Sequence, residues 1–201
     1  MKKLIITLFT AFLCTIGYAQ HAPEATKVLD EVSSIWATST GMQINFTGTI
    51  RGVLQMKEQK FRLTTSQMEY CYDGKTLWSY SPKDKEVIIS TPTSKEMILI
   101  NPYFLLHNYK QTFKSAYGGR KRRENQMVHI ITLTPKQKDE LRSVVLYIND
   151  KKEPTYLKIT LTNGQMMEVR VKNIQRNKSY NTKDFTFESE KNKQLEIIDL
   201  R

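Results

Sequence analysis

Residues 67–82 read QMEYCYDGKTLWSYSP, and this stretch decides the fold that we expect for the whole chain. Asp73-Gly74 is a strong signal for a hairpin turn of two residues. Large side chains alternate with other residues before the turn and resume after it, at Leu77, Trp78 and Tyr80. A strand with this pattern turns one face to the interior and one to water. The expected inner face of this hairpin carries unusually large aromatic groups.

Strand-like segments recur on both sides of this hairpin at intervals of roughly ten residues. Their apolar residues repeat with a period of two, at residues 44–47, 49–57, 61–65 and 85–90. This spacing predicts an antiparallel meander or a barrel-like sheet, and it argues against alternating strand-helix-strand units.

A second group of strands is expected after residue 112. Residues 113–117 and 127–133 could pair with each other, and residues 149–154 separate a strand at 141–148 from one at 155–161. Asn163-Gly164 is a second hairpin turn, which joins residues 156–162 to residues 165–171. Residues 184–187 and 196–200 are expected to add short edge strands. We find no repeat of fixed length and no low-complexity linker, so residues 20–201 are expected to form a single domain.

Residues 23–36 have the pattern of an amphipathic helix. Pro23 suits the first turn and Glu24 the positive end of the helix. Val28, Leu29, Val32, Ile35 and Trp36 recur with helical spacing.

Residues 91–109 interrupt the strand pattern. Thr93-Ser94 can cap a helix, the run 97–100 is continuously apolar, and Asn101-Pro102 separates it from a second apolar run. This is too hydrophobic for a surface connection. We interpret the segment as short helices across the mouth of the sheet. The alternative is an ordinary core helix that plugs a barrel.

The hairpin, with Phe61-Arg62-Leu63 before it and Glu86-Val87 after it, resembles the signature hairpin of the LolA family of periplasmic outer-membrane lipoprotein carriers. The resemblance extends over nearly the whole mature chain. It is carried, in order, by residues 29–34 (LDEVSS), 52–54 (GVL), 133–136 (LTPK), 185–187 (FTF) and 197–201 (IIDLR).

The resemblance implies an α+β fold: a half-open antiparallel β-barrel of about 10–11 strands, with an N-terminal helix and short helices that form a lid over an apolar cavity. The side chains that we expect to line the cavity or its lid are Leu29, Val32, Trp36, Phe46, Leu54, Phe61, Leu63, Trp78, Tyr80, Ile89, Leu99, Phe104 and Leu105. The alternative for each of them is plain core packing.

One feature departs from the family. LolA-type carriers have an arginine-proline pair shortly after the glycine-x-leucine strand, and that arginine ties the lid shut. Here the corresponding residues 57–60 read KEQK, and Arg62 is close by without an assigned role. The lid is therefore expected to be held differently, or the cargo to be another lipid.

Residues 1–19 are expected to be a cleaved signal peptide, with Lys2 and Lys3 before an apolar run and a small-x-small site at Gly17-Tyr18-Ala19. Leu13 stands where lipidation of Cys14 would need a small residue, so we do not expect it. The mature chain then keeps Cys71 alone, which excludes an internal disulfide. We expect an exported, soluble, periplasmic protein.

The chain is strongly basic, with a formal net charge of +11. Export argues against nucleic acid as a partner, which leaves anionic lipid headgroups and acidic proteins. The densest basic run, Arg120, Lys121, Arg122 and Arg123, follows two glycines and is expected in a loop or at a hairpin tip. It is either a solvated turn or a docking patch for an anionic membrane or a transporter.

Catalysis finds little support in the sequence. The nucleophile elbow, paired-histidine metal motif and phosphate loop are all missing. Cys71 and His129 are the residue types of a nucleophile and base, but nothing places them together, and a lone histidine in an alternating strand usually packs. We therefore expect no enzyme, no metal and no cofactor.

The resulting prediction is a monomeric periplasmic carrier. It would shield the acyl chains of lipoproteins or related lipids and shuttle them from the inner to the outer membrane. Its partners would be an inner-membrane releasing transporter and an outer-membrane acceptor. The alternative is a periplasmic lipid-sensing regulatory module on the same scaffold, which transports nothing.

Overall fold

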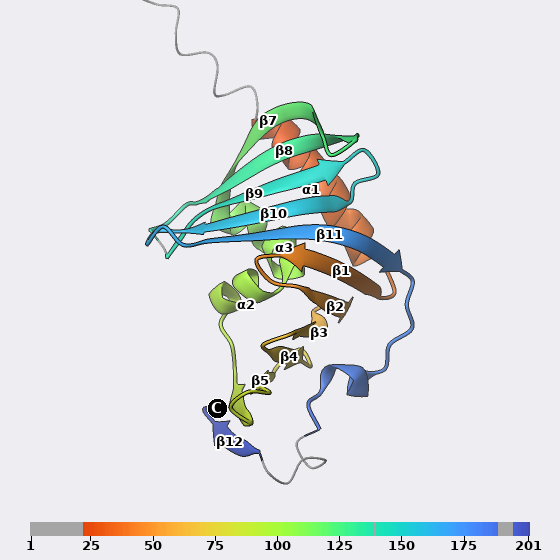
Figure 1. Cartoon of the computed structure of the whole chain (residues 1–201). Helices are drawn as coiled ribbons and strands as arrows, with labels where there is room; N and C mark the ends of the chain where they lie inside the picture. The colour runs from red at the N-terminus through yellow and green to blue at the C-terminus, as the bar shows by residue number, and fades with distance from the viewer. Residues whose placement is uncertain (1–21, 139, 189–194) are drawn as a thin grey trace, which may run out of the picture.

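The computed structural model describes residues 22–138, 140–188 and 195–201, except for the side chain of Leu99 (Figure 1). The signal peptide expected at residues 1–19 lies outside the described residues.

In the described residues, three helices and one 3₁₀ turn accompany a large sheet. The helices are α1 (Ala22–Ala37), α2 (Ser94–Ile100) and α3 (Pro102–Thr112), and the 3₁₀ turn is η1 (Thr182–Phe185). The strands are β1 (Met42–Gly48), β2 (Gly52–Lys57), β3 (Lys60–Thr65), β4 (Glu69–Tyr72), β5 (Leu77–Ser81), β6 (Glu86–Ser90), β7 (Phe113–Arg123), β8 (Gln126–Pro135), β9 (Leu141–Asn149), β10 (Pro154–Leu161), β11 (Met166–Arg176) and β12 (Glu196–Asp199).

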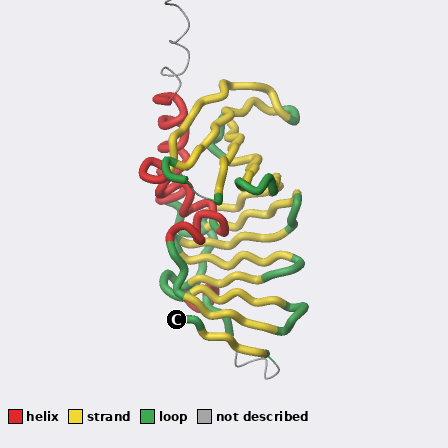
Figure 2. The backbone as a smooth tube through the Cα atoms, turned by 90° about the vertical axis from the view of Figure 1, so that its left-hand side faces the viewer, coloured by secondary structure: helices red, strands yellow, loops and turns green. Residues whose placement is uncertain are grey.

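All twelve strands of the described residues belong to one sheet, in the order β12-β6-β5-β4-β3-β2-β1-β11-β10-β9-β8-β7. Neighbours are antiparallel except β12, which runs parallel to β6. β12 and β7 end this order and do not pair with each other, so the sheet stays open. The expected α+β class and half-open sheet are confirmed, with slightly more strands than expected. Figure 2 shows the long helices gathered along one side of the stacked strands.

Helix α1 forms where its apolar spacing predicts it. Val28, Leu29 and Val32 are buried, and they face the sheet near β7 and helix α3. Glu24 in the first turn complements the positive end of the helix dipole. The buried stripe, rather than helix propensity alone, holds a helix of this length in place.

Helices α2 and α3 are separated by their capping residues. Thr93 and Glu96 form a capping box at the start of α2, with the Glu96 carboxylate accepting from the Thr93 backbone N–H at 2.6 Å. Asn101 ends α2, and its Oδ1 accepts from the Tyr103 backbone N–H at 2.9 Å to cap α3. Pro102 then occupies the first turn, where its missing N–H costs nothing. The predicted interruption at Asn101-Pro102 is confirmed.

The turn of the hairpin at residues 67–82 is longer than predicted. β4 ends at Tyr72 and β5 begins at Leu77, so the loop has four residues and not two. The Asp73 carboxylate accepts from the backbone N–H groups of Lys75 and Thr76 at 2.8 Å. This local bonding takes the place of a two-residue turn.

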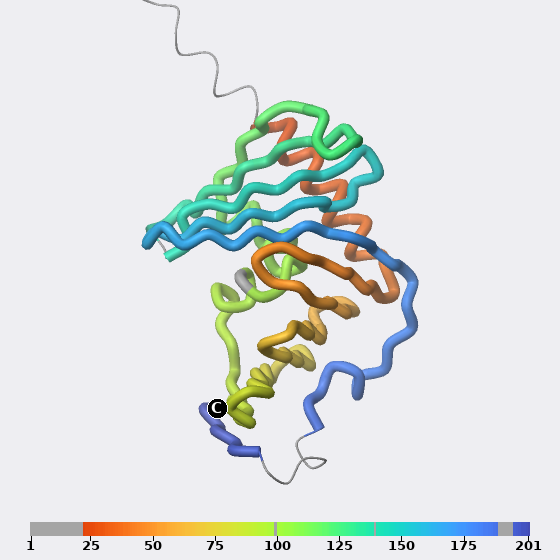
Figure 3. Tube along the Cα trace, in the orientation of Figure 1, coloured from red at the N-terminus to blue at the C-terminus, as the bar shows by residue number. Residues whose placement is uncertain are grey.

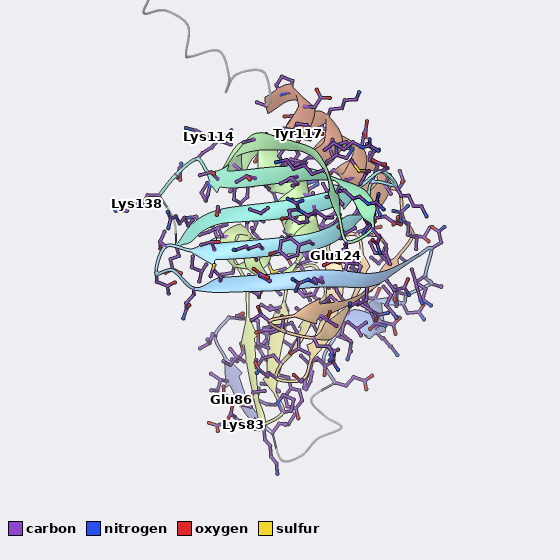
Figure 4. The ribbon with its side chains drawn as sticks, turned by 45° about the horizontal axis from the view of Figure 1, so that its top comes forward. Lys83, Glu86, Lys114, Tyr117, Glu124 and Lys138 are labelled. Atoms are coloured by element: carbon purple, nitrogen blue, oxygen red, sulfur yellow. The ribbon has the colours of Figure 1, made fainter. Side chains whose placement is uncertain are left out.

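The basic run is not at a hairpin tip, which corrects our expectation. Residues 120–123 are part of β7, and the turn lies one step later, at Glu124 and Asn125, both with positive φ (42° and 64°). Two successive residues with positive φ suit the twist of a tight hairpin. Gly118-Gly119 form a bulge, because the β7–β8 register shifts between Tyr117 and Arg120. Figure 4 shows Lys114 and Tyr117 along β7, far from Lys83 and Glu86 at the other end of the sheet.

The segment after β11, residues 177–188, crosses the sheet on the side away from the helices. Figure 3 shows it running from the end of β11 toward β12. The edge strand expected at residues 184–187 is wrong: η1 forms there, with the Asp184 carboxylate accepting from the Asn181 backbone N–H at 2.7 Å. The strand expected near residues 196–200 is confirmed as β12.

Candidate functional site

A cavity of about 220 Å³ lies between the sheet and the helices. Its wall consists almost entirely of aliphatic and aromatic side chains from β1 to β4 and β9 to β11, and Trp36 of α1 completes it. Ile98, Leu105 and Leu106 of helices α2 and α3 form its roof. We call the sheet face that lines this cavity the inner face and the opposite one the outer face. The cavity lining offers a bound molecule dispersion contacts and no charged side chain.

The roof helices are attached to the rest of the molecule mainly through side chains. The Phe104 ring of α3 meets the Tyr72 ring of β4 edge-on at 6.0 Å. Tyr109 of α3 donates a hydrogen bond from its hydroxyl to the Asp30 carboxylate of α1 at 2.7 Å, and Lys110 contacts the other carboxylate oxygen at 2.8 Å. These contacts join helix α3 to helix α1.

The α1–α3 contact sets the ionisation of its members. Burial works to raise the pKa of Asp30, but hydrogen bonds from Lys110 and Tyr109 outweigh it, so the pKa of Asp30 lies below its ordinary value. Burial and the neighbouring carboxylate raise the pKa of Tyr109. At neutral pH the pair is therefore a carboxylate and a neutral phenol.

The structure brings many of the predicted site residues to the cavity. Trp36, Phe46, Leu54, Leu63 and Leu105 form part of its wall. Four others are not in the wall but belong to the surrounding core: Leu29 and Val32 are fully buried in α1, Phe61 is fully buried in β3, and Phe104 packs on Tyr72. The side chain of Leu99 lies outside the described residues.

Trp78, Tyr80 and Ile89 lie on the outer face, which corrects their predicted position at the cavity. Residues directly opposite each other in adjacent strands share a face. Leu63 pairs with Tyr70, which lines the cavity, and Tyr70 pairs with Ser79. Trp78, the neighbour of Ser79, must therefore point the other way, and it pairs with Ile89. Tyr80 packs on Phe187 of the 177–188 segment, with ring centroids 5.1 Å apart.

The sequence analysis did not predict half of the residues that form the cavity wall. They come from the second group of strands, with Leu141, Val144, Leu146 and Ile148 on β9, Leu157 and Ile159 on β10, and Met167, Val169, Val171 and Ile174 on β11. A usable signal was the alternation in residues 141–148 and 157–161. The sequence prediction placed the cavity only under the first group of strands, because the aromatic hairpin lies there.

Arg62 lies on the outer face and not under the lid. Its guanidinium donates to the carbonyl oxygens of Asp184 (2.8 Å) and Thr186 (3.0 Å) and pairs with Glu69. Arg62 therefore holds the 177–188 segment against β3 and β4, where Phe185 and Cys71 are fully buried.

Cys71 and His129 are not brought together. Cys71 is on the outer face of β4, and burial raises the pKa of its thiol to about 12. His129 is on β8, where its Nδ1 lies 2.7 Å from the Tyr117 hydroxyl. Burial, and then Lys152, lowers the pKa of His129. A thiol protonated at neutral pH and remote from a base is not an activated nucleophile. Among the described residues, no three His, Cys, Asp or Glu side chains are grouped to hold a metal ion.

The basic run lies on an edge strand of the sheet. Arg120 is paired with Asp150, with contacts of 3.0 and 2.5 Å, while Lys121, Arg122 and Arg123 are exposed. Charged side chains on an edge strand discourage pairing with another chain. This protection is one physical role of the run.

Comparison with known proteins assigns the family. The sequence profile described as "outer membrane lipoprotein carrier protein LolA" matches residues 15–165. The chain belongs to the LolA family. Curated protein sequences gave no match. In the described part of this LolA-family chain, no helix is both long and apolar enough to span a bilayer.

Solved structures share the fold of this LolA-family chain. An uncharacterized conserved protein from Thermus thermophilus superimposes with a TM-score of 0.62 at 14% identity, covering 88% of this chain and 99% of that one. A DUF1329 family protein from Desulfovibrio piger superimposes with a TM-score of 0.50 at 10% identity, covering 82% and 97%. At these identities the likeness concerns the fold alone.

Proposed function

We propose that this protein is a periplasmic carrier that shields the acyl chains of lipoproteins or related lipids and shuttles them from the inner to the outer membrane. The observation that carries the proposal is the apolar cavity of about 220 Å³ beneath helices α2 and α3. Membership of the LolA family supports it.

The size of the cavity requires the roof to move. An apolar cavity of ~150 Å³ suffices for benzene, and drug-sized ligands occupy about 300–1,000 Å³. The cavity here, at about 220 Å³, lies between these values, so it is too small for several acyl chains in the closed form. Displacing α2 and α3 exposes the full inner face of β9 to β11 as an additional acyl-binding surface.

The energetics explain why a carrier is needed. A buried methylene contributes about 0.8 kcal/mol, so three acyl chains of about 15 methylenes each would cost roughly 36 kcal/mol to leave in water. Because roof helices that pack on the sheet when empty must be displaced first, the net affinity is lowered and release to an acceptor stays possible. The carrier itself then needs no nucleotide hydrolysis.

The remaining assignments follow the same proposal. The signal peptide at residues 1–19 would direct the single domain of residues 20–201 to the periplasm. An inner-membrane transporter would load the carrier, and an outer-membrane acceptor would unload it.

The test is mass spectrometry of material that co-purifies from the periplasm, with two matched variants. Val169 lines the cavity opposite Gly48, so Val169→Trp fills the cavity. Ile89 is half-buried on the outer face, so Ile89→Trp adds the same bulk elsewhere. We expect acylated protein or lipid with the unaltered chain and with Ile89→Trp, and at least about tenfold less with Val169→Trp.

Depletion of the protein decides between carrier and regulator. Loss of a carrier strands lipoproteins in the inner membrane. Loss of a lipid-sensing module would change signalling and leave lipoprotein sorting intact, and that result would refute the carrier.

A further inference from the structure

Two buried hydrogen-bond donors, one in the cavity wall and one on β11, have no partner among the described residues. Trp36 belongs to the cavity wall and is only 4% exposed, yet its indole Nε1 is unpaired. The Nε of Arg176 is likewise buried and unpaired. Buried donors are nearly always paired in folded proteins, since an unpaired one loses its water without compensation. Each of these two donors therefore calls for an explanation.

The strand register places Arg176 at the rim of the cavity. Arg176 lies two residues beyond Ile174, which lines the cavity, and therefore on the same face of β11. It pairs across the sheet with Met42, and Ile174 pairs with Ile44, another lining residue. The side chain of Arg176 is 30% exposed, so this rim also reaches water.

The loop between β9 and β10 brings α1 to the same rim. Oε1 of Glu153 in this loop lies 3.3 Å from Nη2 of Arg176, and Nζ of Lys152 lies 2.6 Å from Oε2 of Glu31 in α1. Trp36 follows Glu31 in α1 by little more than one turn. The end of α1, the β9–β10 loop and the end of β11 therefore meet at one end of the cavity.

The cavity runs from this rim along the sheet. On β9 its wall extends from Ile148, which pairs with Pro154 at the rim, to Leu141 at the far end. The seven residue-to-residue steps from Leu141 to Ile148 span about 23 Å, a length that suits one long extended acyl chain. Apart from the two donors at the rim, this path is apolar, so it discriminates little between one hydrocarbon and another.

We propose that Trp36 Nε1 and Arg176 Nε bind the polar acceptor of an acyl amphiphile, namely a carboxylate or an ester carbonyl, and so fix its direction. The acyl tail lies along β9 to β11 toward Met167, and whatever is attached beyond the acceptor leaves past Arg176. This subsite rests on the proposed lipid-binding function and adds to it the class of ligand and its orientation. The site selects fatty acids and acyl esters over pure hydrocarbons.

A ligand series tests the selectivity. Palmitate, methyl palmitate and hexadecane compete against a fluorescent fatty-acid probe on the unaltered chain, on Trp36→Phe, which keeps an aromatic ring but removes the N–H, and on Arg176→Met. We expect Trp36→Phe to weaken palmitate and methyl palmitate about 3- to 10-fold and hexadecane by less than about 2-fold. Arg176→Met should weaken palmitate most, since its guanidinium is charged. Trp78→Phe, on the outer face, is the matched control and should change nothing.

A second measurement tests the orientation without altering the subsite. The chain has two tryptophans, so Trp78→Phe leaves Trp36 as the only tryptophan whose fluorescence is followed. A long-chain fatty acid with bromine near its carboxylate should quench Trp36 more strongly than one with bromine at its methyl end.

The outcomes separate this inference from the proposed function. Stronger quenching from the methyl end, or equal losses for all three ligands with Trp36→Phe, would overturn the subsite and leave lipid binding intact. Failure of the unaltered chain to bind any of the amphiphiles would overturn the proposed function and the subsite with it.

Discussion

Removing one hydroxyl from the roof should make the protein less stable and yet a tighter binder. Tyr109 ties α3 to α1 through a 2.7 Å hydrogen bond to Asp30, and the same hydroxyl lies 3.2 Å from the Thr26 carbonyl oxygen. Tyr109→Phe deletes both contacts and keeps the ring that packs in the core. If α3 must move to admit an acyl chain, the deleted contact no longer opposes that movement.

The magnitude follows from the geometry. A hydrogen bond to a charged acceptor contributes about 1.5–3 kcal/mol. The Asp30 side chain is 46% exposed, so water compensates part of the loss and about 1 kcal/mol is the better figure. That lowers Tm by about 2–4 °C for a chain of this size. The same ~1 kcal/mol, removed from the cost of opening, tightens amphiphile binding about 5-fold.

The assay pairs urea denaturation with titration of a fluorescent fatty acid. Tyr117→Phe is the control, since Tyr117 also makes a 2.7 Å hydrogen bond, to His129, but lies on the sheet. It should lose comparable stability without gaining affinity. The reasoning is refuted if Tyr109→Phe binds no more tightly than the unaltered chain, or if Tyr117→Phe binds equally tightly.

Three further predictions concern other contacts. Asp30→Asn should cost the full stability difference above about pH 4, because a lowered pKa stabilises the fold above the unfolded value of ~3.9, and the difference should be lost as pH falls from there through the folded value. Urea denaturation across pH measures this, and a difference that persists below the folded value contradicts it. Arg62→Met should cost about 2–3 kcal/mol and speed labelling of Cys71 by a thiol reagent, because the 177–188 segment loses its anchor; an unchanged labelling rate argues against the anchor. Replacing residues 121–123 with glutamine should weaken binding to anionic vesicles by up to ~1 kcal/mol per residue. Co-sedimentation at two salt concentrations measures this, with neutral vesicles as the control. Equal binding by the altered and unaltered chains would contradict membrane docking by the run and leave protection of the sheet edge as its role.

Local signals predicted the elements well, because each is decided by neighbouring residues. The apolar spacing of residues 23–36 predicts α1, and the capping residues Thr93 and Asn101 locate α2 and α3. Turn lengths were less accurate. Asp73 bonds to its own loop and lengthens it, and the β7–β8 turn chose Glu124-Asn125 over the more permissive Gly118-Gly119. Local hydrogen bonds of similar strength compete to set the length and position of a turn, and residue type alone does not tell which of them forms.

The amino-acid sequence by itself determined the order of the helices and strands except at residues 184–187, the open antiparallel class and the family, since these follow from periodicity and motif order. Only the tertiary structure decided which face of each strand meets the cavity. A shift of one residue in register exchanges the two faces of a strand. In the observed register Trp78 and Tyr80 lie on the outer face, while Tyr70 lies on the inner face. Long-range pairing also decided that β9 to β11 complete the wall, and that Arg62 holds residues 177–188 instead of the lid. Contacts between segments more than a hundred residues apart leave no local trace in the chain.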